Sequence, residues 1–140
     1  MLNKEELDKV SEAIKNAEMH TSAEIRVCVA RKCKGNPLEA AAIKFHKLKM
    51  YKTKLRNSVL IYVAPNDHKA AIVGDTGINE AVSEDFWDNV LDDMLYHMRN
   101  QEIVHGICEG VGKVGELINA RYPIMEDDEN ELSNEVIQED

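Results

Sequence analysis

The chain has few cysteines and no long apolar run, and both shortages exclude whole classes of protein. Cys28, Cys33 and Cys108 are odd in number and lack paired CxxC spacing, so neither a disulfide framework nor a zinc ribbon is indicated. No apolar stretch approaches the ~20 residues of a membrane span, and the first residues lack the apolar region of a signal peptide. We therefore expect a soluble, cytoplasmic protein with reduced, mostly buried thiols.

Basic residues are missing from one end of the chain and concentrated in the middle. Residues 124–140 contain eight acidic side chains and no Lys or Arg, within a total formal charge of −9. Residues 1–123 are nearly neutral and, in a chain of 140 residues that is 44% hydrophobic, suit one compact domain. We expect a folded body over 1–123 and an acidic, disordered tail over 124–140.

Residues 26–56 contain ten Lys and Arg side chains and a single acid, Glu39. This spacing predicts a positive, solvent-facing side of a helix, which attracts anions. No nucleic-acid motif accompanies the charge, so a nucleic-acid partner is not expected. A protein partner and a salt-sensitive contact with the acidic tail are the alternatives, and we expect a monomer.

Helical and strand patterns alternate along the body. Asn3 and Glu6 form a capping-box pattern, and Pro37 stands where a helix begins. The apolar run 59–63 predicts a buried strand, which a turn at 65–68 joins to an antiparallel partner. A strand, a helix and a strand in succession imply a parallel crossover. The expected helices are 4–19, 37–51, one capped by Ser83 and a glycine-containing one around 103–118; the expected strands are 24–30, 58–63 and 70–73.

This topology brings polar residues from separate segments to one rim of the sheet, where the first two strands start and the third ends. Glu84, Asp85 and Asp88, at the next helix start, are expected nearby. Carboxylate, hydroxyl and amide oxygens are the ligands that Ca²⁺ and Mg²⁺ prefer. The residues of the expected rim are Thr21, Ser22, Glu24, Thr53, Arg56, Asn57 and Asp75.

Structural roles are open for the same residues. Glu24 can pair with Arg56, Asp75 can cap the turn before Gly77, and Asn57 can satisfy an amide at a strand start. His105 and Cys108 lie three residues apart on a helix, but two ligands do not make a zinc site.

Three segments resemble the TPM domain family: Thr-Ser-Ala-Glu-Ile-Arg-Val (21–27), Arg-Asn-Ser-Val-Leu-Ile (56–61) and Ile-Val-Gly-Asp-Thr-Gly-Ile (72–78). The resemblance covers about residues 5–123, as in a soluble, stand-alone, bacterial-type member. It implies a three-layer α/β/α sandwich, in which a short twisted mixed sheet of three to four strands has helices on both faces.

The resemblance also implies a binding or regulatory module for divalent cations, Ca²⁺ or Mg²⁺, at the edge of the sheet. Carried over to this chain, the metal ligands are Glu24 and Asp75, with Asp85 and Asp88 as additions, while Arg56 and Asn57 orient a carboxylate or a phosphate. Some family members are described as acid phosphatases, so metal-dependent hydrolysis of phosphomonoesters is an alternative. No nucleophile motif is visible, and the catalytic residues of such an enzyme are unknown. A protein-interaction module using the basic helix or the acidic tail is a third hypothesis.

Overall fold

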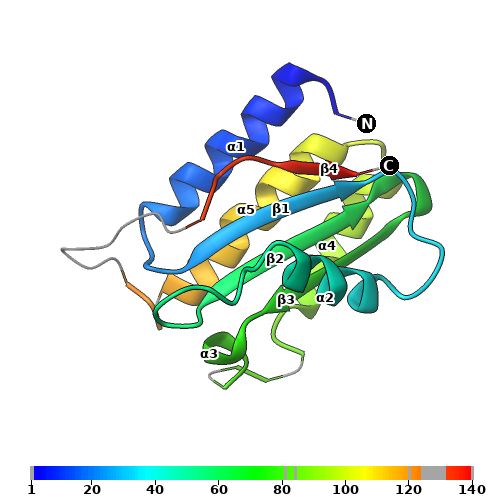
Figure 1. Ribbon diagram of the computed structural model, residues 1–140. Helices are drawn as coiled ribbons and strands as arrows, with labels where there is room; N and C mark the ends of the chain where they lie inside the picture. The colour runs from blue at the N-terminus through cyan, green and yellow to red at the C-terminus, as the bar shows by residue number, and fades with distance from the viewer. Residues whose placement is uncertain (1, 81, 84, 120, 124–131, 140) are drawn as a thin grey trace.

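The computed structural model describes residues 2–80, 82–83, 85–119, 121–123 and 132–139. A four-stranded mixed sheet with the order β3-β2-β1-β4 lies between two layers of helices (Figure 1). The expected α/β/α sandwich is therefore confirmed. The strands are β1 (Glu24–Ala30), β2 (Ser58–Ala64), β3 (Lys69–Gly74) and β4 (Ile137–Glu139), and the helices are α1 (Lys4–Glu18), α2 (Pro37–Lys47), α3 (Thr76–Asn79), α4 (Asp88–Arg99) and α5 (Ile103–Asn119).

Local signals in the sequence set the helix starts of α1 and α2. The Glu6 N–H donates to Asn3 Oδ1 at 2.8 Å while the Asn3 N–H donates to Glu6 Oε1 at 2.9 Å, which completes the predicted capping box. Asn36 caps α2, where Pro37 occupies the first turn. Helix α1 ends one residue before its predicted limit, at Glu18, whereas α2 ends at Lys47, four residues before the predicted limit at residue 51.

The sheet has an apolar core on each face. Helices α1, α4 and α5 cover the face that carries Ile25, Val59 and Ile61. Helix α2 covers the other face, where Phe45 packs with Leu60. All seven residues of β2 are buried, as expected for a central strand covered on both sides.

The register of the sheet produces the predicted rim. β1 runs parallel to β2 with Glu24 opposite Ser58, and β3 runs antiparallel to β2 with Val59 opposite Gly74. The Asp75 N–H donates to the Ser58 carbonyl at 2.9 Å, so Asp75 follows directly on the other side of β2. Glu24, Ser58 and Asp75 thus form one row across the start of the sheet.

Two local predictions after β3 differ from the structure. The segment after Asp75 forms the short helix α3 instead of the expected turn. Ser83 does not cap α4, which begins at Asp88, because its hydroxyl donates to Asp85 Oδ1 at 2.6 Å. A serine bonded to its own loop stabilises a turn instead of a helix start.

The C-terminal segment also differs from its prediction. Residues 137–139 form β4, which pairs in parallel with β1, and the Arg31 N–H donates to the Glu139 carbonyl at 2.8 Å. Val136 and Ile137 pack against the two cores, so apolar side chains hold a strand that the charge pattern assigned to a disordered tail. Residues 124–131 and 140 of that prediction lie outside the described residues.

One alternative considered for the basic helix, a contact with the acidic C-terminal segment, is present. Lys44 of α2 forms an ion pair with Glu139 of β4. Among the described residues, no helix is both long and apolar enough to cross a membrane.

Candidate cation site at the strand starts

The buried polar side chains of the described residues gather at one end of the sheet. They belong to the segments that precede or begin β1 and β2, or that follow β3. Burial of a polar group costs free energy unless a partner compensates for it. Their concentration at one end of the sheet therefore makes this end the candidate functional site. The residues are Thr21, Glu24, Thr53, Asn57, Ser58 and Asp75.

Asp75 is held by two neighbours. Arg56 donates to its carboxylate twice, from Nε to Oδ2 at 2.7 Å and from Nη2 to Oδ1 at 2.9 Å. The same Oδ1 accepts from the Thr76 N–H at 2.8 Å, which caps α3. The hydrogen bond to Asp75 raises the pKa of Arg56. Arg56 therefore pairs with Asp75, and the capping role predicted for Asp75 is confirmed.

Hydrogen bonds hold the loop before β2 against α3. Arg56 adopts a left-handed backbone conformation with φ of 50°, which is uncommon for a residue with a side chain. Its carbonyl accepts from the Gly77 N–H at 2.8 Å. The Tyr122 hydroxyl donates to the Gly77 carbonyl at 2.6 Å from the far side. Gly77 is thus enclosed between two chain segments that are distant in the sequence.

Glu24 meets a second carboxyl group, that of Glu18. Glu24 is 3% exposed, and its side chain is hydrogen-bonded to that of Glu18 at the last residue of α1. Glu18 Oε2 also accepts from the Ile25 N–H at 2.8 Å. Burial, and then the neighbouring Glu24 carboxylate, raises the pKa of Glu18 from 4.5 to about 8, although the Ile25 hydrogen bond opposes this shift. One proton is therefore held between the two carboxyl groups at neutral pH.

Sequence reasoning missed Glu18 as part of this site. One signal was present: an acidic residue in the last turn of a helix, where the helix dipole favours a basic one.

Thr53, in the loop before β2, has a buried hydroxyl that has no hydrogen-bond partner among the described residues.

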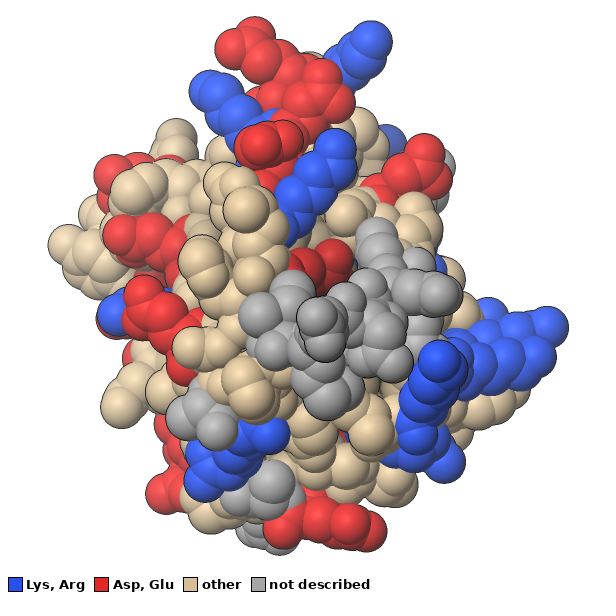
Figure 2. All heavy atoms as spheres, turned by 90° about the vertical axis from the view of Figure 1, so that its left-hand side faces the viewer, with Lys and Arg blue, Asp and Glu red and all other residues tan. Residues whose placement is uncertain are grey.

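Figure 2 looks onto this end of the molecule, the left-hand side of Figure 1, where β1 and β2 start. Acidic side-chain atoms are visible in a recess near the centre of the face, below the surrounding surface. Basic side chains project at its margins.

Two of the predicted acidic ligands lie on the surface near the start of α4. Asp85 and Asp88 are exposed, and neither belongs to a group of three potential metal ligands within 4.8 Å of one another among the described residues. Glu84 lies outside the described residues. Asn57 is buried and donates from Nδ2 to the Ser22 carbonyl at 3.3 Å, so it ties the starts of β1 and β2 together.

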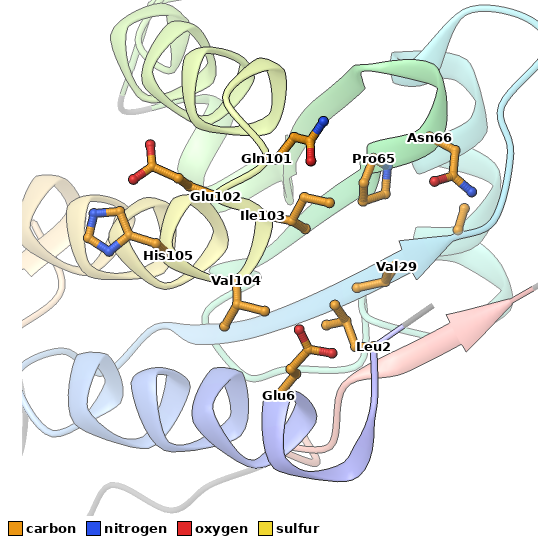
Figure 3. Close-up of a pocket in the computed structure, with 11 residues that line it drawn as sticks. Leu2, Glu6, Val29, Pro65, Asn66, Gln101, Glu102, Ile103, Val104 and His105 are labelled. Atoms are coloured by element: carbon orange, nitrogen blue, oxygen red, sulfur yellow. The ribbon is translucent and has the colours of Figure 1, made fainter.

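A cavity of about 400 Å³ lies at the other end of the sheet, between the N-terminal parts of α1 and α5. Glu102 and His105 lie on one side of it and Val29, Pro65 and Asn66 on the other (Figure 3). This cavity was not predicted, because its lining comes from four separate segments, within 2–6, 29–30, 65–66 and 101–105.

Comparison with known proteins places these features in context. The sequence model of the TPM domain matches residues 1–117, and no match was found among curated proteins. The NMR structure of the BA42 protein from the psychrophilic bacterium Bizionia argentinensis is 38% identical, covers 99% of this chain and 95% of that chain, and has a TM-score of 0.90. The N-terminal domain of the cg2496 protein from Corynebacterium glutamicum shares the fold, at 13% identity and a TM-score of 0.64 over 83% of this chain and 73% of that chain.

Proposed function

Because this chain belongs to the TPM domain family, we propose that it is a binding or regulatory module for divalent cations, with its site at the strand starts around Glu18 and Glu24. The observation that carries the proposal is the contact of the partly buried Glu18 carboxyl group with the buried carboxyl group of Glu24. Burial and mutual repulsion disfavour the state in which two adjacent carboxyl groups are both ionised, and a bound positive charge relieves that repulsion. A proton does so at low pH, and a metal ion does so above the pKa of the pair.

The chemistry of the surrounding groups favours Ca²⁺ or Mg²⁺ over softer metals. The donors are oxygens, because both proposed ligands, Glu18 and Glu24, are carboxylates. Asp75 lies in the same row of the sheet, across β2 from Glu24. Its bidentate partner Arg56 offsets the charge of Asp75, so we assign Asp75 to positioning the rim and Glu18 and Glu24 to direct ligation.

The proposal is tested by titrating isotope-labelled protein with Ca²⁺, and separately with Mg²⁺, after exhaustive chelation. We expect saturable NMR shifts at the amides of Glu24 and Ile25 and at the end of α1. Glu24→Gln removes one ligand charge and is expected to weaken binding at least tenfold, since the number of charged ligands sets calcium affinity. The apparent affinity should also rise with pH, because the ion displaces the proton shared by Glu18 and Glu24.

Glu12→Gln provides the matched control, because it makes the same charge change at an exposed position of α1. It should leave the affinity unchanged. Glu18→Gln serves as a second ligand variant in case the Glu24 variant folds poorly. Equal calcium affinity in the wild type and in both ligand variants would refute the proposal.

Hydrolysis of phosphomonoesters, with Arg56 and Asn57 orienting the phosphate, stays a prediction. Arg56 already uses two of its donors on Asp75, and Asn57 is bonded to Ser22. Asp85 and Asp88 likewise stay predictions as additional ligands, as does a protein partner for the basic helix.

A further inference from the structure

A second cluster of metal-ligating side chains lies where α4 ends and α5 begins. His97 is in the last turn of α4, and His105 and Glu109 are one turn apart on α5. One ligand atom from each lies within 4.8 Å of the others, and no further group of three was found among the described residues. The cluster is separate from the Glu18–Glu24 pair, because it lies near the opposite end of the sheet, beside the cavity of Figure 3.

The distances within the cluster are close to those of a metal site. Glu109 Oε2 lies 2.9 Å from His97 Nε2, and Glu109 Oε1 lies 3.4 Å from His105 Nε2. In a tetrahedral zinc site with bonds of 2.0–2.2 Å, neighbouring ligand atoms are about 3.3 Å apart. Small side-chain rotations are therefore enough for all three atoms to reach one ion.

A neighbouring carboxylate orients the first imidazole. His97 Nδ1 lies 3.3 Å from Glu102 Oε1, so an Nδ1–H can donate to this carboxylate. An ion that displaces the proton between His97 Nε2 and Glu109 Oε2, which are 2.9 Å apart, would then bind the Nε2 lone pair. Metal-bound histidines commonly have such a carboxylate behind them, which fixes the tautomer and the ring orientation. Glu102 would act as a positioning residue.

The packing of the two helices supports the same arrangement. A Cβ at position 106 would lie 2.7 Å from His97 Cβ, so only glycine lets α5 approach α4 at this point. This close approach places the His97 ring against His105, with ring centroids 4.8 Å apart.

The cluster is open to solvent on one side. The His97 side chain is 17% exposed, whereas those of His105 and Glu109 are more than half exposed. The 400 Å³ cavity is lined by Glu102 and His105, and a second depression of about 380 Å³ is lined by Glu109 and Asp93. An ion can therefore reach the three ligands, and space is left for water at a fourth position.

We propose that His97, His105 and Glu109 bind a divalent transition-metal ion, with Zn²⁺ as the best match. Two imidazoles and one carboxylate suit zinc and its neighbours in the first transition row, whereas Ca²⁺ and Mg²⁺ prefer oxygen ligands alone. The chain would then carry two sites of different chemistry at opposite ends of one sheet.

Isothermal titration of the chelated protein with Zn²⁺ tests this proposal. We expect one saturable site, whose affinity falls at least tenfold in His105→Gln and in Glu109→Gln. Both side chains are more than half exposed, so neither replacement should unfold the protein, and circular dichroism checks this. Glu102→Gln should weaken binding about 10-fold or more, as is typical for the carboxylate behind a ligating histidine.

A control variant makes the result specific. His46→Gln makes the same change as His105→Gln at an exposed position of α2, away from the cluster. It should retain the zinc affinity of the wild type. If zinc does not bind saturably, or if it binds His105→Gln and Glu109→Gln as tightly as the wild type, the proposal is wrong.

Discussion

Replacing Glu18 with glutamine is expected to increase the free energy of unfolding at pH 8 by on the order of 2 kcal/mol in the absence of metal ions. In the wild type, ionisation of Glu18 places a second negative charge beside buried Glu24 and at the C-terminal end of α1. Glutamine stays neutral at every pH. The glutamine side-chain oxygen can still accept from the Ile25 N–H, and the side-chain amide NH2 can donate to Glu24.

The pH dependence follows from the direction of the shift. The pKa of Glu18 lies at about 8 in the folded protein and near 4.5 in the unfolded chain, so the folded state binds the proton more tightly. The stabilisation that protonated Glu18 provides is complete below pH 4.5 and is lost as the pH rises through 8. A shift of one pKa unit corresponds to about 1.4 kcal/mol of stability. Because Glu18 is only partly buried, solvent screening reduces the loss expected from the whole shift to on the order of 2 kcal/mol.

Urea unfolding at pH 4.5 and at pH 8 measures the effect. The wild type and Glu18→Gln should differ little at the lower pH and most at the higher one. Saturating Ca²⁺ should restore stability at pH 8 to the wild type and not to the variant, which connects the measurement to the proposed site. A constant difference between the two proteins at all pH values would show that Glu18 does not titrate as described.

Gly77→Ala is expected to destabilise the protein by on the order of 3 kcal/mol. A Cβ at position 77 would lie 2.5 Å from the Leu55 carbonyl oxygen and 2.6 Å from that of Arg56. These are backbone atoms, so no side chain can rotate to relieve the contact. The loop and α3 would have to separate, and the hydrogen bond from the Gly77 N–H to the Arg56 carbonyl would be lost with them.

Thermal and urea unfolding of Gly77→Ala should be compared with those of Gly112→Ala. A Cβ at position 112 meets nothing within 4 Å, and the residue lies inside α5. Alanine there should stabilise the protein by about 1 kcal/mol, because it favours the helix more than glycine does. If the two alanines changed stability in the same direction, the close packing of Gly77 would not be the cause.

Much of the fold and part of the site could be predicted from local patterns. The capping box at Asn3 and the buried run of β2 each depend on residues that are near in sequence, so their signals survive without tertiary information. The strand–helix–strand order then led to the shared rim of Glu24 and Asp75. Ser83 misled the prediction because its hydroxyl has a competing acceptor in Asp85, two residues away.

The tertiary structure decided three contacts between charged or polar side chains. They are the pairs Glu18–Glu24, Arg56–Asp75 and His97–His105. The glycines of α5 illustrate the same limit: Gly106 packs against His97 and Gly112 packs against nothing, although both interrupt the same helix. The order of the first three strands and the amphipathic helices were determined by the sequence alone, since periodicity and caps act over a few residues. Which charged groups meet depends on how distant segments pack, and that packing also joined residues 137–139 to β1.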